Sequence, residues 1–248
     1  MEHSKPTPIE RDFKNIREVR QNNNNTIVYE CLREGDLKKL NKNINKEEYK
    51  RTLLDLELTE EDFVSECKDN NLFAKLASGR LSKNASRQGV GDEIEQIRTC
   101  NITSQKCGVI IEKLTATELR PTKDGSIVSN DEKKIKKIPK DCCLKSFDAK
   151  ISGKIKGYMS AKVVIGDGGH QDSVFEEMDN LADWWKKYRS ESEEILIILI
   201  DTDSDSITKF TKFTTLKEKY INVNNVKVFN HIELQQYMIS SYYIDESV

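Results

Sequence analysis

The sequence predicts an α/β fold in which helices flank a central mixed β-sheet, preceded by a helical N-terminal region. Three observations predict it. From residue 107 onward, short apolar or β-branched runs alternate with amphipathic stretches. The turn signal Ser152-Gly153 lies between two such runs, as in a hairpin. Residues 195–200, ILIILI, are apolar throughout, as in a strand buried on both faces. Alternation of this kind places helices on both sides of a mixed sheet.

The composition is that of a protein with a charged surface and a sizeable core. The chain has 248 residues, 36% of them hydrophobic, and a formal net charge of −2. No apolar run approaches the length of a membrane span, and the N-terminus MEHSKPTPIERDFKN lacks the apolar stretch of a signal peptide. The six cysteines form no CxxC pair, which indicates packed, reduced thiols and not a zinc site. We therefore expect a cytoplasmic protein.

Residues 1–81 are predicted to form a helical region packed on a core that comprises residues 82–248. QNNNN at residues 21–25 indicates a loop, and Thr59-x-x-Asp62 resembles a helix N-terminal cap that separates two helices near residue 58. No residue of this region suggests chemistry, so it is expected to be a scaffold or a dimerisation layer.

The core is predicted to open with a loop and a helix. The loop contains Arg87 and Gln88, which can contact a phosphate or a base edge. The helix begins near Asp92 and Glu93, where carboxylates are stabilised by the helix dipole. Glu93 is a candidate site residue; the alternative is a carboxylate that only satisfies the helix terminus.

A strand at residues 107–114 is followed by a polar, turn-rich segment with a run of lysines. The run comprises Lys133, Lys134, Lys136, Lys137 and Lys140. A positive loop ahead of the hairpin suits contact with DNA phosphates, and Lys136 and Lys137 are candidates for it. The alternative is an ordinary solvated loop.

The predicted hairpin, with strands at residues 147–151 and 155–165, presents Asp148 and Lys162 side by side. Such a pair suits hydrolysis of a phosphodiester. The carboxylate holds a divalent metal, which neutralises phosphate charge and activates water, and the lysine steadies the nucleophile and the scissile oxygen.

Asp148, followed by Ser160-Ala161-Lys162, resembles the motif of the PD-(D/E)XK nucleases, and among them the type II restriction endonucleases. Asp148 precedes Ser160 by twelve residues, within the family's spacing. Serine replaces the family's second carboxylate, as in a branch that has Ser-x-Lys and a glutamate on the following helix. Glu176, fourteen residues after Lys162, matches that glutamate. The resemblance implies Mg²⁺ held by Asp148 and Glu176, with Lys162 orienting the attacking water and Glu93 close to the metal.

The helix after the hairpin gives a second view of that glutamate. Its buried stripe is predicted to comprise Val174, Met178, Leu181, Trp185 and Tyr188. Glu177 flanks this stripe, while Glu176 points nearly opposite to it. The spacing favours Glu176 and the helical phase favours Glu177, so one of the two is the expected ligand, with Glu176 preferred.

Between the hairpin and this helix lie glycines and then His170, Gln171 and Asp172. These three side chains can read base edges in the major groove, as the resemblance implies for this segment. Alternatively, Asp172 or Asp167 caps the helix and the glycines only turn the chain. The glycines match neither a P-loop nor a GxGxxG fingerprint, so no nucleotide cofactor is expected.

The remaining C-terminal elements are predicted to be a helix at 205–220, a strand at 226–229 and a helix at 231–240. The carboxylates of Asp201-Thr202-Asp203 follow the apolar strand and either bind metal or begin the next helix as caps.

The resemblance covers residues 85–230 and implies a Mg²⁺-dependent restriction endonuclease that cuts double-stranded DNA at a short palindromic site. Such an enzyme acts as a homodimer, because each active site serves one strand. Two alternatives remain open: a structure-selective or repair nuclease on the same core, and a non-catalytic DNA-binding module, which Ser160 and the nearly neutral net charge would suit.

Overall fold

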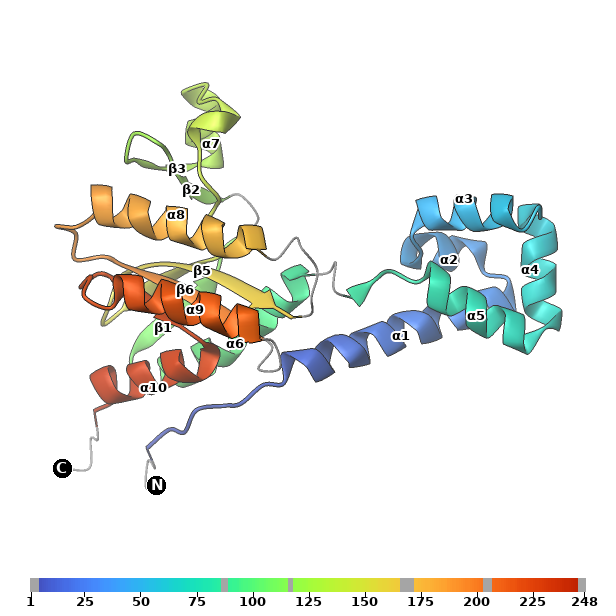
Figure 1. Cartoon of the computed structure of the whole chain (residues 1–248), viewed down its shortest axis with the longest axis horizontal. Helices are drawn as coiled ribbons and strands as arrows, with labels where there is room; N and C mark the ends of the chain where they lie inside the picture. The colour runs from blue at the N-terminus through green and yellow to red at the C-terminus, as the bar shows by residue number, and fades with distance from the viewer. Residues whose placement is uncertain (1–4, 86–88, 116–117, 166–171, 203–206, 245–248) are drawn as a thin grey trace. The chain divides into compact units, whose positions relative to one another are not determined.

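The computed structural model describes residues 5–85, 89–115, 118–165, 172–202 and 207–244 (Figure 1). It divides into two compact units, a helical unit of Asp12–Gly89 and a core unit of Met1–Arg11 with Val90–Val248. The predicted fold class is confirmed, because a mixed five-stranded sheet is flanked by helices and preceded by a helical region. Among the described residues, no helix is long and apolar enough to cross a membrane.

The helices α1 to α5 of the helical unit each begin at a side-chain cap. The helices are α1 (Phe13–Glu34), α2 (Leu37–Asn43), α3 (Lys46–Asp55), α4 (Glu60–Asp69) and α5 (Asn71–Leu81). Asp12, Asp36, Asn45 and Asn70 each accept a hydrogen bond from a first-turn N–H, and so does Thr59, whose predicted capping role is confirmed. Val28, Leu32, Phe63 and Leu81 are among the side chains that close a separate apolar core.

The loop predicted at QNNNN is wrong, because these residues lie inside α1. Asparagine is a weak helix former, but the difference from alanine is only about 0.7 kcal/mol per residue. The following turns bury Val28 and Leu32, and α1 has its termini defined by Asp12 and by Gly35 at φ 73°. Tertiary packing therefore decides the conformation of this stretch.

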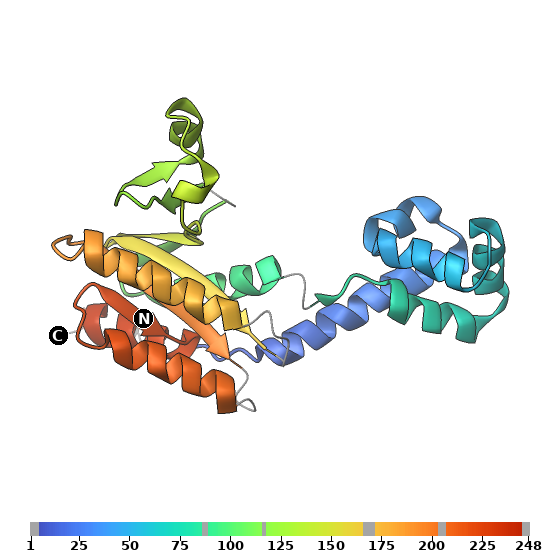
Figure 2. The same cartoon turned by 45° about the horizontal axis from the view of Figure 1, so that its top comes forward.

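The core unit is built on a sheet with strand order β1-β4-β5-β6-β7 (Figures 1 and 2). β4 pairs antiparallel with β1 and β5, while β5, β6 and β7 run parallel. The elements in chain order are α6 (Gly89–Gln105), β1 (Val109–Lys113), β4 (Ala149–Gly153), β5 (Gly157–Val164), α8 (Asp172–Tyr188), β6 (Ile195–Thr202), α9 (Ile207–Tyr220), β7 (Val226–Phe229) and α10 (His231–Tyr242). Each of these was predicted, with shifts of a few residues at the ends.

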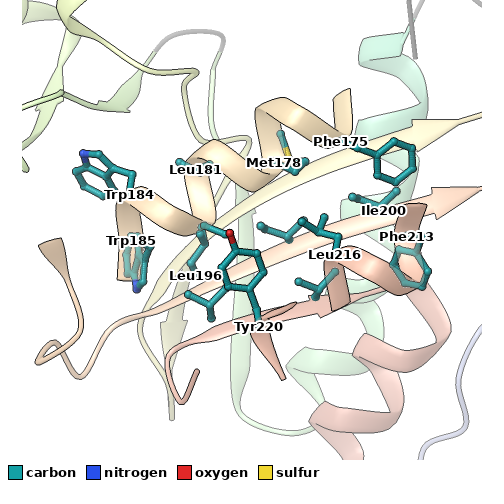
Figure 3. Close-up of a cluster of buried hydrophobic side chains, with 14 of the residues drawn as sticks. Phe175, Met178, Leu181, Trp184, Trp185, Leu196, Ile200, Phe213, Leu216 and Tyr220 are labelled. Carbon is teal, nitrogen blue, oxygen red and sulfur yellow. The ribbon is translucent and has the colours of Figure 1, made fainter. Parts of the chain in front are cut away.

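Helices cover both faces of this sheet, as the alternation of elements predicted. On one face α8 and α9 pack on β6, where Met178, Leu181 and Trp185 meet Leu196 and Ile200 (Figure 3). On the other face, α6 and α10 pack on the alternate residues of the same strand, among them Ile197 and Leu199. β6 is buried on both faces, which explains its continuous apolar sequence.

A small substructure between β1 and β4 was not predicted. It contains the two-stranded hairpin β2 (Leu119–Pro121) and β3 (Ile127–Ser129), the short helix α7 (Asn130–Ile135) and the 3-10 turn η2 (Lys140–Cys142). α8 holds the hairpin: the Trp184 indole donates to the Thr122 carbonyl at 2.6 Å and the Tyr188 hydroxyl donates to the Lys123 carbonyl at 2.9 Å.

The segment that precedes α1 belongs to the core unit. The backbone N–H of Ile9 donates to Gln235 Oε1 at 2.8 Å, and Gln235 Nε2 donates to the Ile9 carbonyl at 3.0 Å. The N–H of Arg11 donates to His231 Nε2 at 3.1 Å, and the Arg11 guanidinium pairs with Glu95 at 3.0 Å. The chain therefore leaves the core unit after residue 11 and returns at residue 90, whereas the sequence suggested a single boundary near residue 81. The predicted packing of residues 1–81 on the core stays a prediction.

Candidate functional site

Asp148 lies immediately before β4, and β5 fixes its position. Its N–H donates to the Met159 carbonyl at 2.8 Å. Its carboxylate oxygen Oδ2 accepts the Ala161 N–H at 2.9 Å and the Ser160 hydroxyl at 3.2 Å. Asp148 is 8% exposed, so this carboxylate is nearly buried with two neutral donors on one oxygen.

Lys162, near the end of β5, extends its ammonium to that same carboxylate oxygen. Nζ lies 3.2 Å from Asp148 Oδ2 and 2.8 Å from the Ala161 carbonyl, and it also donates to Glu93 Oε1. Burial lowers the pKa of Lys162, but the negative charges of Asp148 and Glu93 outweigh burial and raise it above the ordinary value. Lys162 is therefore charged at neutral pH. The prediction that Asp148 and Lys162 meet across neighbouring strands agrees with this arrangement.

Glu93 reaches the site from the first turns of α6. Burial and the charge of Asp148 raise the pKa of Glu93, and the opposing effects of Lys162 and Lys113 only partly offset this. The alternative in which Glu93 merely satisfies the helix terminus does not account for this inward position. Its carboxylate joins a cluster of charges.

Lys113, at the end of β1, is a site residue that the sequence analysis missed. Its Nζ lies 3.8 Å from Glu93 Oε2 and 3.8 Å from Asp148 Oδ1. Glu93, Asp148, Lys113 and Lys162 thus form a compact arrangement of two acids and two bases, called the charge quartet below. A signal for Lys113 was present: in the strand VIIEK it stands two and four residues after Ile111 and Val109, on the same face as these two apolar residues.

Glu176 and Glu177 lie elsewhere. Glu176 is exposed and lines a groove between α8 and α9 together with Lys212 and Lys219. Glu177 is half-buried and pairs with Lys145 at 2.9 Å, in agreement with its predicted helical phase. Within the described part of the chain, no three acidic, histidine or cysteine side chains lie close enough together to hold a metal. The structure therefore does not bring Glu176 to Glu93 and Asp148, and its predicted place in the metal site is corrected.

The carboxylates of Glu93 and Asp148 fit a divalent cation on the chemistry of their donor atoms. Mg²⁺ is commonly bound through one or two carboxylates and completes its shell with water and substrate oxygens. The ammonium of Lys162 already contacts both carboxylates, so a positive charge is stabilised where they converge. The Ser160 hydroxyl donates to Asp148, and because it is neutral it adds no negative charge to the site.

The structure describes only some of the residues predicted to contact DNA. Arg87, Gln88, His170 and Gln171 lie outside the described residues, and Asp172 begins α8 with a side chain that is not described. Lys136 is the C-cap residue after α7; it is exposed and lies 3.8 Å from Glu132. Lys137 is exposed in a left-handed conformation, at φ 52°. Contact of these lysines with DNA stays a prediction.

Asp201 plays a different part from either role predicted for it. Its carboxylate accepts Gln96 Nε2 at 2.6 Å, lies 2.6 Å from His231 Nδ1 and accepts the His231 N–H at 3.1 Å. From the end of β6 it thereby satisfies the first N–H of α10, whose N-cap residue is Asn230, and it does not begin α9. Among the described residues it belongs to no group of three metal-ligating side chains. Asp203 lies outside the described residues. Gln96 also donates to the Lys162 carbonyl at 3.3 Å, which ties α6 to β5 next to the charge quartet.

Comparison of the chain with models of protein families, with curated proteins and with solved structures finds no match.

Proposed function

We propose that the chain is a metal-dependent nuclease of the type II restriction kind, which hydrolyses phosphodiester bonds of double-stranded DNA. The order α6, β1, β4, β5, α8, β6 agrees with the core of the PD-(D/E)XK nucleases that the motif resembles. The observation that carries the proposal is the convergence of the Glu93 and Asp148 carboxylates on the Lys162 ammonium. A helix and two adjacent strands supply these groups, and all three are nearly buried.

In this proposal Glu93 and Asp148 would hold Mg²⁺, and Glu93 takes the place first expected for Glu176. The cation, when bound, supplies positive charge that polarises the phosphate and makes water a better nucleophile. Lys162 acts as a charged donor and not as a base, because the neighbouring carboxylates raise its pKa. It would orient the water oxygen and stabilise charge on the phosphate. Water forms a bond to phosphorus as the bond to O3′ breaks, leaving a 5′-phosphate and a 3′-hydroxyl.

Digestion of plasmid DNA with purified protein and Mg²⁺ tests the proposal. Discrete fragments are expected of a restriction enzyme, and sequencing their ends gives the recognition site and the cut position. Cleavage of junctions or damaged DNA alone would favour the repair nuclease. Binding without cleavage of any DNA, with Mg²⁺ or Mn²⁺, would overturn the nuclease proposal in favour of a binding module.

Glu93→Gln and Glu176→Gln are a matched pair of single variants that test which glutamate belongs to the site. Glu93→Gln is expected to lower the cleavage rate at least about 100-fold, since a charged ligand is replaced by a neutral amide. Glu176→Gln, on the exposed face of α8, is expected to stay within about 3-fold of wild type, a difference of less than 1 kcal/mol. Equal losses in the two variants would restore Glu176 to the site.

A palindromic site cut in both strands also needs two active sites related by a two-fold axis, which implies a homodimer. Sedimentation of the protein with and without DNA tests this part. A monomer under both conditions would contradict the palindromic target without affecting the assignment of the charge quartet.

A further inference from the structure

Lys113 lies in β1, an edge strand of the sheet, and faces the interior of the core unit. Along β1 the burial alternates: Val109 and Ile111 are buried, while Ile110 and Glu112 are exposed. Lys113 falls in phase with the buried residues, and its side chain is 29% exposed. A lysine that served only solubility would be expected on the exposed face of the strand, together with Ile110 and Glu112. The alternation along β1 therefore directs the Lys113 side chain toward the carboxylates of Glu93 and Asp148.

Pairing with β4 holds Lys113 in place. Lys113 lies opposite Ala149 in the antiparallel register, and the next N–H, that of Leu114, donates to the Asp148 carbonyl at 3.0 Å. The backbone that carries the ammonium is thus bonded to the backbone of the acid that it approaches. Strand pairing therefore places the Lys113 side chain next to the Asp148 carboxylate.

The four charges of the quartet alternate. Lys162 contacts Oε1 of Glu93 and Oδ2 of Asp148, while Lys113 lies 3.8 Å from the other oxygen of each carboxylate. Two ammoniums and two carboxylates sum to a charge of zero. Without a divalent cation the site therefore offers little attraction to a phosphodiester, although it contains two lysines.

A divalent cation would compete with the ammoniums for the same carboxylate oxygens. Lys113 is the more weakly held of the two lysines, since its contacts are at 3.8 Å and its side chain is 29% exposed, against 11% for Lys162. Lys162 keeps a further bond to the Ala161 carbonyl at 2.8 Å. Displacement by a cation would therefore release Lys113 first.

We propose that Lys113 is a phosphate-binding residue of this site, held by Glu93 and Asp148 in the metal-free protein and released to a DNA phosphate when a divalent cation binds them. This inference rests on the proposed nuclease function. With the cation bound, the charge of the site changes from zero to +2, so metal and DNA strengthen each other's binding. The alternative is that Lys113 has a structural role only and neutralises the neighbouring carboxylates of Glu93 and Asp148.

The affinities of Lys113→Gln for Mg²⁺ and for DNA distinguish the proposal from this alternative. Removing a competing ammonium should tighten the binding of Mg²⁺, measured by calorimetry, by at least about 3-fold. Removing a phosphate contact should weaken the binding of duplex DNA in Ca²⁺, measured by fluorescence anisotropy, by about 10-fold, with the salt slope reduced by about 1. A residue that only neutralised the carboxylates would change the metal affinity and leave DNA binding in Ca²⁺ as in wild type.

Lys227→Gln is the matched control, because Lys227 is a half-buried lysine of β7, the strand at the opposite edge of the same sheet. Neither affinity should change in it. Lys113→Arg, which keeps the positive charge beside the phosphate, should retain DNA affinity within about 2-fold. Gel analysis of the duplex after each titration shows that it stays intact in Ca²⁺.

The unmodified wild-type protein gives an independent readout. The reactivity of the Lys113 amine toward an acetylating reagent, followed by mass spectrometry, should rise when Ca²⁺ is added and fall below its starting value when DNA is also present. Unchanged Lys113 reactivity in Ca²⁺, or unchanged DNA affinity in Lys113→Gln, overturns the inference and leaves the nuclease proposal in place. A wild-type protein that binds neither Mg²⁺ nor duplex DNA overturns both.

Discussion

Asp148 stands at the start of β4 and Asp201 near the end of β6, and the two carboxylates are 8% and 7% exposed. Asp201 is surrounded by donors that packing fixes in place: the Gln96 amide, the His231 imidazole and the first N–H of α10. Asp148 has two neutral donors from β5 and, beyond them, two lysine ammoniums at the ends of long side chains.

These donors indicate which of the two buried acids can exchange its partners for a new one. An ammonium on a flexible stem can leave a carboxylate at little cost to the surrounding backbone, whereas the donors of Asp201 cannot move without disturbing α6 or α10. α6 serves both sites, since it sends Glu93 to one and Gln96, three residues later, to the other. We infer that Asp201 stabilises the scaffold and that Asp148 is available for chemistry.

The strongest test of this contrast compares cleavage by Asp148→Asn and Asp201→Asn. Asp148→Asn is expected to lower the single-turnover rate at least about 1000-fold, or about 4 kcal/mol, because the charge proposed to hold the cation is lost. Asp201→Asn, measured per folded molecule, should stay within about 10-fold of wild type. Similar losses in both variants would remove the distinction between the two aspartates.

Stability should respond in the opposite order. Asp201→Ala removes the buried carboxylate that accepts from the Gln96 amide and from His231, so the free energy of unfolding should fall by about 3 kcal/mol. Asp148→Ala should lower the free energy of unfolding by about half as much. Lys162 retains its ion pair with Glu93, and the Lys113 side chain can turn toward water. Urea denaturation in EDTA measures both values. A larger loss in Asp148→Ala would contradict the assignment of Asp201 to the scaffold.

The dependence of stability on pH should single out the crowded site. The pKa of Glu93 is raised in the folded protein by burial and by the charge of Asp148. Its contribution to stability is therefore present below the ordinary pKa of glutamate and is lost as the pH rises through the raised value. Lys162, with its own raised pKa, stays charged throughout this range.

The free energy of unfolding should accordingly fall in wild type, relative to Glu93→Gln, as the pH rises from 4 toward 7 in EDTA. Chemical denaturation at several pH values gives this difference. A difference that grows in favour of wild type over the same range would show that Lys162 and Lys113 more than compensate for the crowding. Saturating Mg²⁺ should reverse the trend in wild type only, because binding to the folded state stabilises it.

The smallest effect is expected of Ser160→Ala. The Ser160 hydroxyl donates to Asp148 at 3.2 Å and is fully buried. Its removal should lower the free energy of unfolding by about 1 kcal/mol, the usual value of one hydrogen bond. Cleavage should persist, since Ser160 supplies no charge. A loss of cleavage comparable to that of Asp148→Asn would indicate that the hydroxyl contacts the reacting groups.

The fold could be predicted where hydrophobic periodicity was strong. β7 begins and ends at the predicted residues, and the apolar run that starts at Ile195 is the central strand. QNNNN was mistaken for a loop because its local preference was weaker than the packing of Val28 and Leu32 one turn later. The hairpin of β2 and β3 was missed because its three-residue strands are too short to show a period.

The candidate site could be predicted in part. Asp148 and Lys162 were identified because adjacent strands of a hairpin place them side by side. Glu93 was identified because the resemblance implies a glutamate on the first helix of the core. Glu176 was placed by spacing alone, and the helical phase, which had favoured Glu177, shows that spacing along a chain does not fix the direction of a side chain. Lys113 was overlooked because its partners come from α6 and from the start of β4, far away along the sequence.

The bond between Ile9 and Gln235 also bears on the order in which the chain can fold during synthesis. The two residues are 226 positions apart, so at typical rates of elongation the first segment waits roughly 10 to 45 s for its partner. The helical unit of Asp12–Gly89, which lies wholly between them, leaves the ribosome well before α10 exists. The bonds of Ile9 to Gln235 therefore form late, after α10 has been synthesised.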